Sequence, residues 1–579
     1  MLPTISVVLF VLAAIGSTAA RCRSEPGQLG FPSTQDWTAL NETVDGRLVA
    51  VVPSAKACAD IGCTAAQWSS STFRNALPGQ MNAVSSWQNY TSDPAELCLH
   101  NSTGSCSQGD VPLYAINATS PEHLQAGVSF ASQHDLRVSV KSSGHDYLGR
   151  STARNSLLLW TQYFQDIEFT ESFTVGDEDK GSAVTVGSGV GLHTLYLAAK
   201  AVNKMVVGGA AATVSAGGGY TQGAGHSAFG PIYGLAADNT LQYEVVLANG
   251  SFVTVNEVSN PDLFWALRGG GAGSWAVIVS ITMRTYPTFP ATAHVAYISF
   301  NSTDQAAAAM TIHARHIFDW DDLRAGQYFY LYNIGRGRSF LRMNTLFANV
   351  SGDDAKAAIA PFIADVQTVG ATFINETVTT AIANDIVGAA DDNAGINVIL
   401  GSRLVPATQY EHNPEVIGAA YKTLLDQDVD AYVLLSFCTL RRLLIQVIRS
   451  ILGLLVAGGK VAENANINSA ILPKWRTAKT HVITVKTWND STSPSDAVAI
   501  QERFTSQSVS VLAAATGEDD SGSYSNEADV REPDFQTTFF GPNYHRLSSI
   551  KAQYDPKDLF IVCAGVGSER WDSAGMCSV

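Results

Sequence analysis

The chain has 579 residues, of which 46% are hydrophobic and 15% are charged, so it is a folded globular protein and not a disordered one. Its length exceeds that of one ordinary core, which predicts two or more domains. The formal net charge of −16 at pH 7 argues against nucleic acid or an anionic membrane as a partner, since both would repel the chain.

Residues 1–20 have the pattern of a secretory signal peptide. An apolar run over residues 5–15 is followed by small residues up to Ala20, after which cleavage is expected. Nine N-x-S/T sequons agree with export and predict N-linked glycans on a secreted protein. They begin at Asn41, Asn89, Asn101, Asn117, Asn249, Asn301, Asn349, Asn375 and Asn489.

All eight cysteines follow the signal peptide, and their number is even. In an oxidising compartment the close pairs Cys58/Cys63 and Cys98/Cys106 are expected to form disulfides. Zinc binding would need paired short spacings with histidine partners, which these cysteines do not have. The sequence leaves four cysteines without an assigned partner: Cys22, Cys438, Cys563 and Cys577.

Residues 21–106 are rich in loop-forming sequence and are expected to wrap on the first domain as an N-terminal extension. A strand is predicted over 112–117, and a helix follows from Pro121, a residue that favours the first helical position. Two further strands are predicted over 136–141 and 157–160. The segment between these strands is the loop that carries the most chemistry.

That loop contains small and hydrogen-bonding residues around one histidine, in the order SSGHDYLGRS over residues 142–151. A loop between strands presents bare backbone N–H groups, which suit a pyrophosphate. From the pattern alone, an ordinary surface turn with an exposed histidine explains the segment at least as well.

Three glycines, Gly187, Gly189 and Gly191, lie between a predicted strand over 184–190 and a predicted helix over 192–202. This arrangement invites a nicotinamide-binding interpretation, but the spacing is GxGxG and no acidic residue follows about 20 positions on. A tight packing turn or a loop of another cofactor domain is the better interpretation.

Residues 206–239 form a second region dense in glycine, where the backbone can approach a ligand closely. A structural loop is the alternative, and the residues alone do not decide. A hairpin over 241–255 follows, with Asn249-Gly250 as its turn. A strand over 274–287 closes this part of the chain.

Residues 290–519 change character and predict a separate α+β domain that binds the substrate. Strands are expected over 294–300, 327–334 and 340–350, and helices over 304–318, 353–369 and 414–427. Residues 440–456 are strongly apolar but are interrupted by arginines and are too short for a confident membrane span. We expect a buried helix there. An insertion or a gene-model error over 439–457 is the alternative.

Several of these segments resemble one family. The loop SGHDYLGRS at 143–151 is similar to the flavin-attachment loop of the berberine-bridge-enzyme-like FAD-linked oxidases, which have the p-cresol methylhydroxylase/vanillyl-alcohol oxidase fold. The second glycine region and NPDLFWALRGGGAG at 260–273 follow in the family's order, and YSNEAD at 524–529 and FGPNYHRL at 540–547 resemble its returning tail.

The resemblance implies an α+β fold of two domains and one FAD. An FAD-binding domain of the p-cresol methylhydroxylase type would span 107–289, the substrate domain 290–519, and the tail over 520–579 would return to the first domain. The family's histidine, here His145, carries a covalent bond to the 8α carbon of the flavin. Many members add a second bond from a cysteine in a GxCxTV segment, but residues 209–214 place Ala211 there, so a single bond is expected.

The resemblance also implies a set of FAD contacts around His145. They are Ser142, Ser143, Gly144, Asp146, Tyr147, Gly149, Arg150, Ser151, Gly209, Thr213, Gly218, Gly219, Gly223, His226, Gly234, Asp238, Asn526 and Asn543. Lys141, Arg150 and Lys551 are candidate phosphate or structural partners, although surface solvation is the favoured role for any one of them.

The catalytic base is expected in the tail segment. Tyr524 ranks first, because a tyrosine can take a hydroxyl proton if a neighbouring positive charge or flavin contact lowers its pKa. Glu527 is the second catalytic candidate, and Asp529 is also possible. No metal is expected, and the absence of GxSxG and HExxH gives no support to a hydrolase.

The expected activity is that of a secreted oxidase, which takes a hydride from a C–OH, C–H or C–N bond of a sugar or secondary metabolite and reduces O2 to H2O2. A dehydrogenase of the same fold with a quinone or protein acceptor is the second interpretation. A flavin-carrying binding glycoprotein with little turnover is the third.

Overall fold

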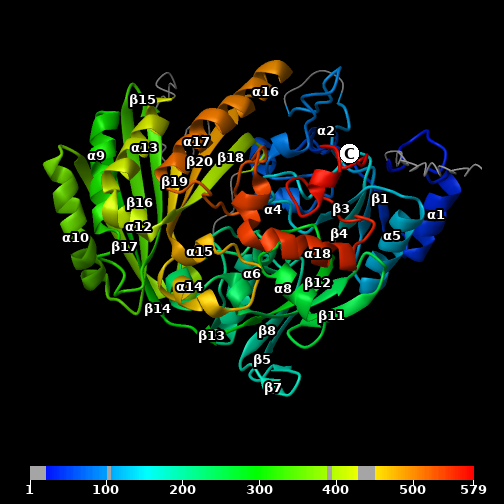
Figure 1. Ribbon diagram of the computed structural model, residues 1–579, viewed down its shortest axis with the longest axis horizontal. Coiled ribbons are helices and arrows are strands. Elements are labelled where there is room, and N and C mark those ends of the chain that lie inside the picture. Colours follow the sequence, from blue (N-terminus) through cyan, green and yellow to red (C-terminus); the bar gives the residue numbers. More distant parts are fainter. Residues whose placement is uncertain (1–20, 101–105, 388–393, 428–449) are drawn as a thin grey trace, which may run out of the picture.

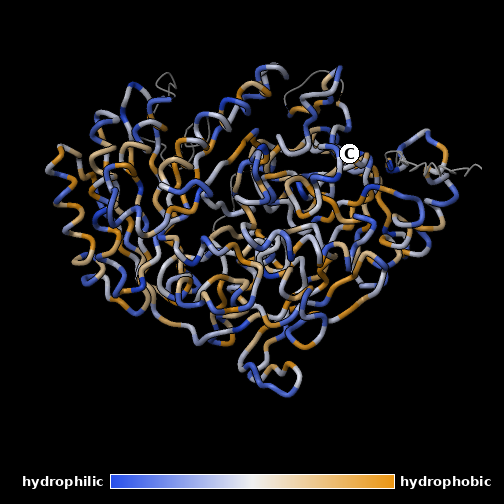
Figure 2. The backbone as a smooth tube through the Cα atoms, in the orientation of Figure 1, coloured by the Kyte–Doolittle hydropathy of each residue, from blue (hydrophilic) through white to orange (hydrophobic). Residues whose placement is uncertain are grey.

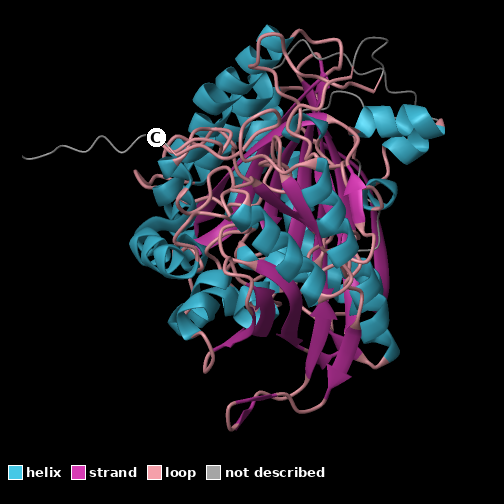
Figure 3. Ribbon diagram, turned by 90° about the vertical axis from the view of Figure 1, so that its right-hand side faces the viewer, coloured by secondary structure: helices cyan, strands magenta, loops and turns pink. Residues whose placement is uncertain are grey.

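The computed structural model describes residues 21–100, 106–387, 394–427 and 450–579. The expected signal peptide, the sequon at Asn101 and the cysteine at Cys438 lie outside these residues. Three large sheets organise the described chain, two in its first half and one in its second half (Figure 1). Seen from the side, strands run through the centre and most helices lie outside them (Figure 3).

The first sheet has four strands in the order β1-β2-β4-β3. Strands β2 and β3 each run parallel to β4, while β1 is antiparallel to β2. Helix α5 (Pro121–Gln133) connects β2 to β3 and buries Leu124 and Val128. The strands are β1 (Leu48–Ala50), β2 (Tyr114–Asn117), β3 (Val138–Lys141) and β4 (Leu157–Trp160).

The second sheet has five antiparallel strands in the order β11-β10-β12-β8-β5. Its predicted hairpin is confirmed, with Gly250 at φ +82 in the turn between β10 and β11. The strands are β5 (Ile167–Thr170), β8 (Ala183–Gly187), β10 (Thr240–Val246), β11 (Phe252–Asn256) and β12 (Val277–Arg284), and helices α6 (Leu192–Ala201) and α8 (Pro261–Leu267) accompany them.

The GxGxG segment is a packing turn, as the spacing indicated. A Cβ atom on Gly187 would lie 2.3 Å from the carbonyl oxygen of Phe164, and one on Gly189 would lie 2.2 Å from that of Gln162. Both distances are shorter than any real carbon–oxygen contact. The glycines therefore let two backbone segments touch.

The third sheet has seven antiparallel strands in the order β17-β14-β16-β15-β19-β20-β18. One of its faces is covered by α9 (Thr303–His316), α10 (Gly352–Thr368) and α13 (Pro414–Asp426), which pack with it into one apolar cluster (Figure 1). The predicted strands and helices of this region are confirmed. The strands are β14 (Pro290–Phe300), β15 (Gly326–Gly335), β16 (Arg338–Ala348), β17 (Thr372–Ile382), β18 (Asn397–Pro406), β19 (Ser450–Leu455) and β20 (Ala478–Trp488).

Residues 450–455 correct one prediction. They form strand β19 in the middle of the third sheet, between β15 and β20, and not part of a buried helix. A central strand covered on both faces reads as a continuous apolar run, which periodicity cannot distinguish from a buried helix. The rest of the predicted helix, before residue 450, lies outside the described residues.

The predicted N-terminal extension is more helical than its loop-rich sequence indicated. It contains α1 (Thr34–Thr43), α2 (Ser54–Ile61), α3 (Ala65–Trp68) and α4 (Ser71–Asn75). Short helices elsewhere are α7 (Gly230–Tyr233), α11 (Ala383–Ile386), α12 (Ala407–His412), α14 (Gly459–Glu463), α15 (Lys474–Thr477), α16 (Pro494–Arg503) and α17 (Ser510–Ala515). Two-residue strands are β6 (Thr174–Val175), β7 (Glu178–Asp179), β9 (Lys204–Met205) and β13 (Tyr286–Pro287).

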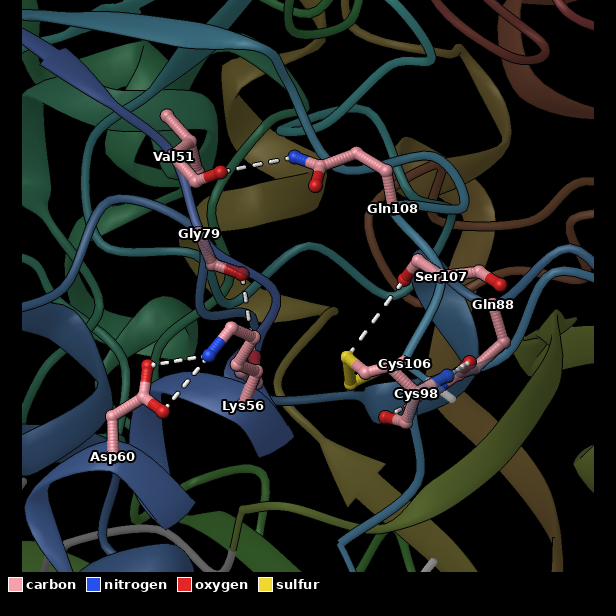
Figure 4. Close-up of a disulfide and its surroundings, with 10 residues drawn as sticks. Val51, Lys56, Asp60, Gly79, Gln88, Cys98, Cys106, Ser107 and Gln108 are labelled. Atoms are coloured by element: carbon pink, nitrogen blue, oxygen red, sulfur yellow. Dashed lines mark hydrogen bonds and ion pairs between the residues drawn. A yellow bond between two sulfur atoms is a disulfide. The ribbon is translucent and has the colours of Figure 1, made fainter. Parts of the chain in front are cut away.

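Both predicted disulfides are present, Cys58–Cys63 and Cys98–Cys106. Figure 4 shows the second one beside Gln88, whose side chain accepts from the backbone N–H of Cys98 and donates to its carbonyl oxygen. A third disulfide, Cys22–Cys577, joins the two ends of the described chain, a pairing that the sequence did not give. Among the described residues, Cys563 is the free cysteine.

The C-terminal segment packs on the first half of the chain. Helix α18 (Tyr544–Tyr554) lies against α8 (Figure 1). Its Lys551 is fully buried and donates to the carbonyl oxygens of Ser274 and Phe560 and to the carboxylate of Asp555. The expectation that Lys551 is solvated at the surface is therefore wrong.

Hydrophobic and hydrophilic residues alternate along the whole backbone (Figure 2), and the main buried hydrophobic cluster draws residues from both halves of the chain. Within the described residues, no helix has both the length and the apolar character needed to cross a membrane.

Candidate functional site

A cavity of about 630 Å³ lies between the first half of the chain and the third sheet. One side, which we call the loop wall, consists of lining residues within 140–151, 188–192, 209–226 and 272–278, together with Thr161. The other side, the sheet wall, consists of Tyr328, Tyr330, Arg342, Asn344, Leu452, Leu454 and Ile483. Three residues of the tail also line the cavity: Tyr524, Asn526 and Glu527.

The loop after β3 turns at Gly144, whose φ of +82 favours glycine. A Cβ atom there would also lie 2.9 Å from Cε of Lys141. The Lys141 ammonium is fully buried and donates to the carbonyl oxygens of Leu77, Pro78 and Gln80, so it fixes the base of the loop and is not solvated at the surface. Burial holds its pKa well below the ordinary value.

The ring of His145 is held by two polar side chains at the cavity. The amide nitrogen of Asn82 lies 3.0 Å from Nδ1 and 3.1 Å from Nε2, and the hydroxyl of Thr213 is hydrogen-bonded to Nε2. Thr213 in turn donates to the hydroxyl of Ser71. The imidazole therefore has a fixed orientation although it stands in a loop.

A polar network joins this loop to the tail. Asp146 accepts from the backbone N–H groups of Leu148 and Arg150, and from Nε of Arg150 at 2.6 Å. Arg150, which is buried, then donates to Oδ1 of Asn526 at 2.8 Å. Surface solvation of Arg150 is thus excluded, and the arginine serves as a link between segments far apart in sequence.

The second glycine region belongs to the same network. Asn526 donates to the carbonyl oxygen of Gly219 at 3.0 Å and to the hydroxyl of Tyr524 at 2.8 Å. A Cβ atom on Gly223 would lie 2.5 Å from the amide nitrogen of Asn526, so only glycine leaves room for that side chain. The hydroxyl of Ser142 bridges the two loops through its hydrogen bond to the hydroxyl of Ser215, 2.6 Å away.

The sheet wall is built from two rows of side chains that cross the third sheet. Directly paired residues of antiparallel strands point to the same face. The first row is Arg342, Tyr330, Leu452 and Ile483, and the second row is Asn344, Tyr328, Leu454 and His481. This face lies opposite the helices α9, α10 and α13.

Glu527 stands between two buried histidines. Its Oε2 lies 3.2 Å from Nε2 of His226 and 3.4 Å from Nδ1 of His481. Burial opposes ionisation of Glu527, but the electrostatic interaction and hydrogen bond with His226 favour it, and the pKa of Glu527 lies below the ordinary value. Burial lowers the pKa of His481 to about 3. The carboxylate is thus ionised beside a neutral His481.

These three groups are also of metal-ligand types, and their ligand atoms lie within 4.8 Å of one another. The Glu527 carboxylate already has a hydrogen-bond partner in His226. His481 makes no hydrogen bond among the described residues. Proton transfer at the carboxylate is the simplest chemistry of this cluster.

Tyr524 does not have the lowered pKa that its predicted role as base requires. Burial raises the pKa of its phenol well above the ordinary value, and the nearby charge of Glu527 acts in the same direction. Its hydroxyl accepts from Asn526 and faces the carbonyl oxygen of Tyr220. A neutral phenol placed in this way can orient groups but is a weak base.

Comparisons with known proteins identify the family. Residues 112–256 match the family model described as "FAD binding domain", and residues 523–567 match "Berberine and berberine like". An FAD-linked oxidoreductase of Arthroderma benhamiae is 35% identical over 599 aligned positions, which cover 98% of each chain. The chain belongs to the berberine-bridge-enzyme-like FAD-linked oxidoreductases.

Solved structures agree with this assignment. The VAO-type flavoprotein MtVAO615 from Myceliophthora thermophila is 28% identical and superimposes with a TM-score of 0.81 over 96% of this chain and 100% of its own. The glucooligosaccharide oxidase of Acremonium strictum, 20% identical, has the same fold with a TM-score of 0.61 over 79% of this chain and 92% of its own. The predicted α+β fold of this superfamily is confirmed.

The loop wall suits the FAD that this family binds. Backbone at Gly217, Gly218 and Gly219 lines the cavity, and a Cβ atom on Gly219 would lie 2.9 Å from Cβ of Ala272, so the backbone there packs closely against its neighbours. The buried hydroxyl of Ser188 and the amide oxygen of Gln222 also line it and have no hydrogen-bond partner among the described residues. A polar ligand that reaches these two groups would satisfy both.

Most of the predicted FAD contacts come together at this wall. The predicted residues that line the cavity are Ser142, Ser143, Gly144, His145, Asp146, Tyr147, Arg150, Ser151, Gly209, Gly218, Gly219, His226 and Asn526. Thr213 holds His145, and Gly223 makes room for Asn526, so both act through a neighbour. Gly149, at φ +77, turns the loop against the carbonyl oxygen of Ser86.

Three predicted contacts lie elsewhere. Asp238 is buried in an ion pair with Arg476, and its carboxylate also accepts from the backbone N–H of Leu235. Gly234, at φ +85, leads into that turn. Asn543 donates to the carbonyl oxygens of Ala470 and Ile471. None of Gly234, Asp238 and Asn543 is among the cavity-lining residues, and Asp238 and Asn543 each have a structural partner that explains their presence.

Sequence reasoning did not identify the sheet wall, Asn82 or His481 as parts of the site. The alternation of residues along a strand predicts which side chains share a face of the sheet, but it does not predict which strands are neighbours. Asn82 lies on a coil segment far from any motif and reaches His145 only through the fold.

Proposed function

We propose that this oxidoreductase is a secreted oxidase that holds FAD by one covalent bond, at His145, and oxidises a small molecule with O2 as electron acceptor. The observation that carries the proposal is the position of His145, which lines the cavity with its ring fixed by Asn82 and Thr213. A ring held in one orientation is what attachment of a cofactor at a defined carbon requires.

The single bond follows from residue 211. The Acremonium strictum relative of the same fold is described as carrying a 6-S-cysteinyl, 8α-N1-histidyl FAD, which has two bonds to its flavin. In this chain Ala211 lines the cavity at the position that the family pattern gives to the cysteine. Alanine has no sulfur, so His145 is the remaining tether. A single bond should leave the flavin with a lower potential than two.

Bound FAD would supply the hydride acceptor, and the chain would supply the proton acceptor. Glu527 lines the cavity, keeps about a quarter of its side chain exposed, and has one oxygen anchored by His226. We assign the base to Glu527, because it is ionised, whereas the phenol of Tyr524 stays neutral. A substrate hydroxyl would give its proton to this carboxylate as its carbon gives up the hydride.

The proposed substrate is a sugar or a secondary metabolite with an oxidisable C–OH, C–H or C–N bond. Export is proposed from the signal-like residues 1–20 and the sequons, and N-linked glycans with it. The disulfides of the described chain are what an oxidising compartment favours.

One experiment separates the oxidase from its alternatives. The purified holoprotein is mixed anaerobically with a panel of sugars and alcohols while flavin absorbance is followed, and O2 is then admitted. An oxidase bleaches with a substrate and recovers with stoichiometric H2O2. Bleaching without peroxide would indicate a dehydrogenase with another acceptor, and no bleaching with any compound would favour a binding glycoprotein.

A further inference from the structure

Arg342 is a charged residue that lines the cavity and has no ion-pair partner among the described residues. It stands on β16 in the first row of the sheet wall, half-buried, with its guanidinium 5.5 Å from the centre of the Tyr330 ring. Among the described residues, no carboxylate lies within ion-pair distance of it. The two acidic groups that line the cavity are already engaged, Asp146 by Arg150 and Glu527 by His226.

The groups around Arg342 point to a ligand with two parts. In the second row, the amide oxygen of Asn344 is buried without a hydrogen-bond partner among the described residues, and the hydroxyl of Tyr328 is buried beside the backbone of Ala228. The rest of the sheet wall is apolar, with Leu452, Leu454 and Ile483 as its members. The wall therefore offers one cation and two neutral polar groups at the margin of an apolar surface.

We propose that the cavity accepts a small carboxylic acid, which Arg342 holds through its carboxylate while the apolar body lies on the sheet wall. A guanidinium matches a carboxylate with two parallel N–H donors, and an arginine kept without a protein partner in a recess is available for this pairing. The proposal rests on the proposed function, since Arg342 lines the same cavity as Glu527, the proposed base.

Binding of simple acids to the holoprotein tests the proposal without any turnover. Benzoate, phenylacetate and hexanoate would be titrated by isothermal calorimetry, each beside its neutral amide of the same shape. We expect the acids to bind roughly 10- to 100-fold more tightly than the amides, as one charged hydrogen-bonded pair implies. If no acid in the series binds better than its amide, the proposal is wrong.

Variants locate the preference. Arg342→Gln should abolish the difference between acid and amide, while Arg342→Lys should keep part of it because the charge remains. Arg338→Gln is the matched control, since Arg338 lies on the same strand but is exposed to solvent. A preference that survives in Arg342→Gln, or that falls equally in Arg338→Gln, would overturn the proposal.

Sulfite distinguishes a substrate subsite from a charge that serves the cofactor. Sulfite adds to N5 of oxidised flavins, and the adduct is stabilised by positive charge near the ring. If Arg342→Gln weakens sulfite binding but keeps the preference for acids, Arg342 serves the flavin and the proposal fails. Calorimetry of the acids does not depend on oxidase turnover, so failure of the subsite and failure of the oxidase proposal are separate results.

Discussion

The loop wall and the sheet wall enclose one cavity but hold their polar groups in different ways. In the loop wall the charged groups are paired: Asp146 with Arg150, and Arg150 with Asn526. In the sheet wall Arg342 has no ion-pair partner among the described residues, and the buried amide oxygen of Asn344 has no hydrogen-bond partner there. The charged groups of the loop wall are thus paired within the protein, whereas the sheet wall presents a charged group that a ligand can pair.

The difference indicates a division of work. The backbone of the loop wall is fixed by glycine contacts and buried cations. Such a rigid wall suits a cofactor that stays bound through every catalytic cycle. A flat sheet face, with side chains on regular rows, can change one residue at a time without disturbing its hydrogen-bond ladder. We therefore expect substitutions at the loop wall to affect flavin binding or stability, and substitutions at the sheet wall to affect which substrate binds.

The largest expected effect is at the base. Glu527→Gln keeps the shape of the side chain but removes its capacity to accept a proton, so kcat should fall about 10²- to 10⁴-fold. Tyr524→Phe is the matched variant, and it should lose only about 5-fold, the effect of one hydrogen bond. Stopped-flow measurement of flavin reduction compares the two. The opposite order would assign the base to Tyr524.

The buried ion pair between Lys551 and Asp555 tests how strongly the C-terminal segment stabilises the first half of the chain. Asp555→Asn leaves the Lys551 ammonium buried without its carboxylate, and we expect a loss of about 3–5 kcal/mol in the free energy of unfolding. The exposed pair Lys56–Asp60 has the same residue types at the same spacing (Figure 4), so Asp60→Asn should change stability by less than about 1 kcal/mol. Denaturant unfolding measures both, and equal losses would contradict the account.

The acid limb of activity follows from the pKa of Glu527. Because that pKa is held below its ordinary value, the carboxylate is ionised at neutral pH and is lost as a base only when the pH falls through the lowered pKa. The profile of kcat/KM should thus be flat down to about pH 4.3, the ordinary pKa of a glutamate, and fall below it. An acid limb centred near pH 6 would show that the cofactor or substrate raises this pKa instead.

The smallest expected effect concerns the number of covalent bonds between the flavin and the protein. Ala211→Cys restores the sulfur that the family pattern places there, and a second covalent bond should form without loss of the first. Peptide mass spectrometry would find one flavin linking the peptides that contain residues 145 and 211. The variant Ala210→Cys is the control, because residue 210 directly precedes residue 211, the position at which the family pattern has its cysteine. A flavin still bound only to His145 in Ala211→Cys would show that residue 211 is misplaced for the reaction.

The sequence predicted the loop wall better than the sheet wall because of how each is encoded. His145, Asp146 and Arg150 lie within six positions of one another, so they form one segment that can be recognised from the sequence. Their network includes Asn526, which belongs to the tail segment that the family resemblance also identifies. Arg342, Tyr330 and Ile483 stand on three strands, and only the order β16-β15-β19-β20 brings them into one row. Strand order depends on the whole fold and leaves no local signal.

The wrong predictions have physical causes of the same kind. Asp238 lies next to the glycine region in sequence, but its charge is neutralised by Arg476, a residue of the other half of the chain. Lys141 and Lys551 were expected at the surface because lysine is rarely buried, yet both are enclosed by carbonyl oxygens. Residues 451–455 are apolar on both faces, because Leu452 and Leu454 line the cavity while Ile451 and Leu455 pack in the cluster under the helices.

The most direct test of the central claim is the covalent state of the flavin. The holoprotein is denatured with acid, the pellet is examined for yellow colour, and its peptides are analysed by mass spectrometry. We predict a yellow pellet with the flavin on the peptide that contains His145 and none on the peptide that contains Ala211, and a colourless pellet from His145→Ala. A colourless pellet from the unaltered protein, or a flavin attached at another residue, would contradict the account.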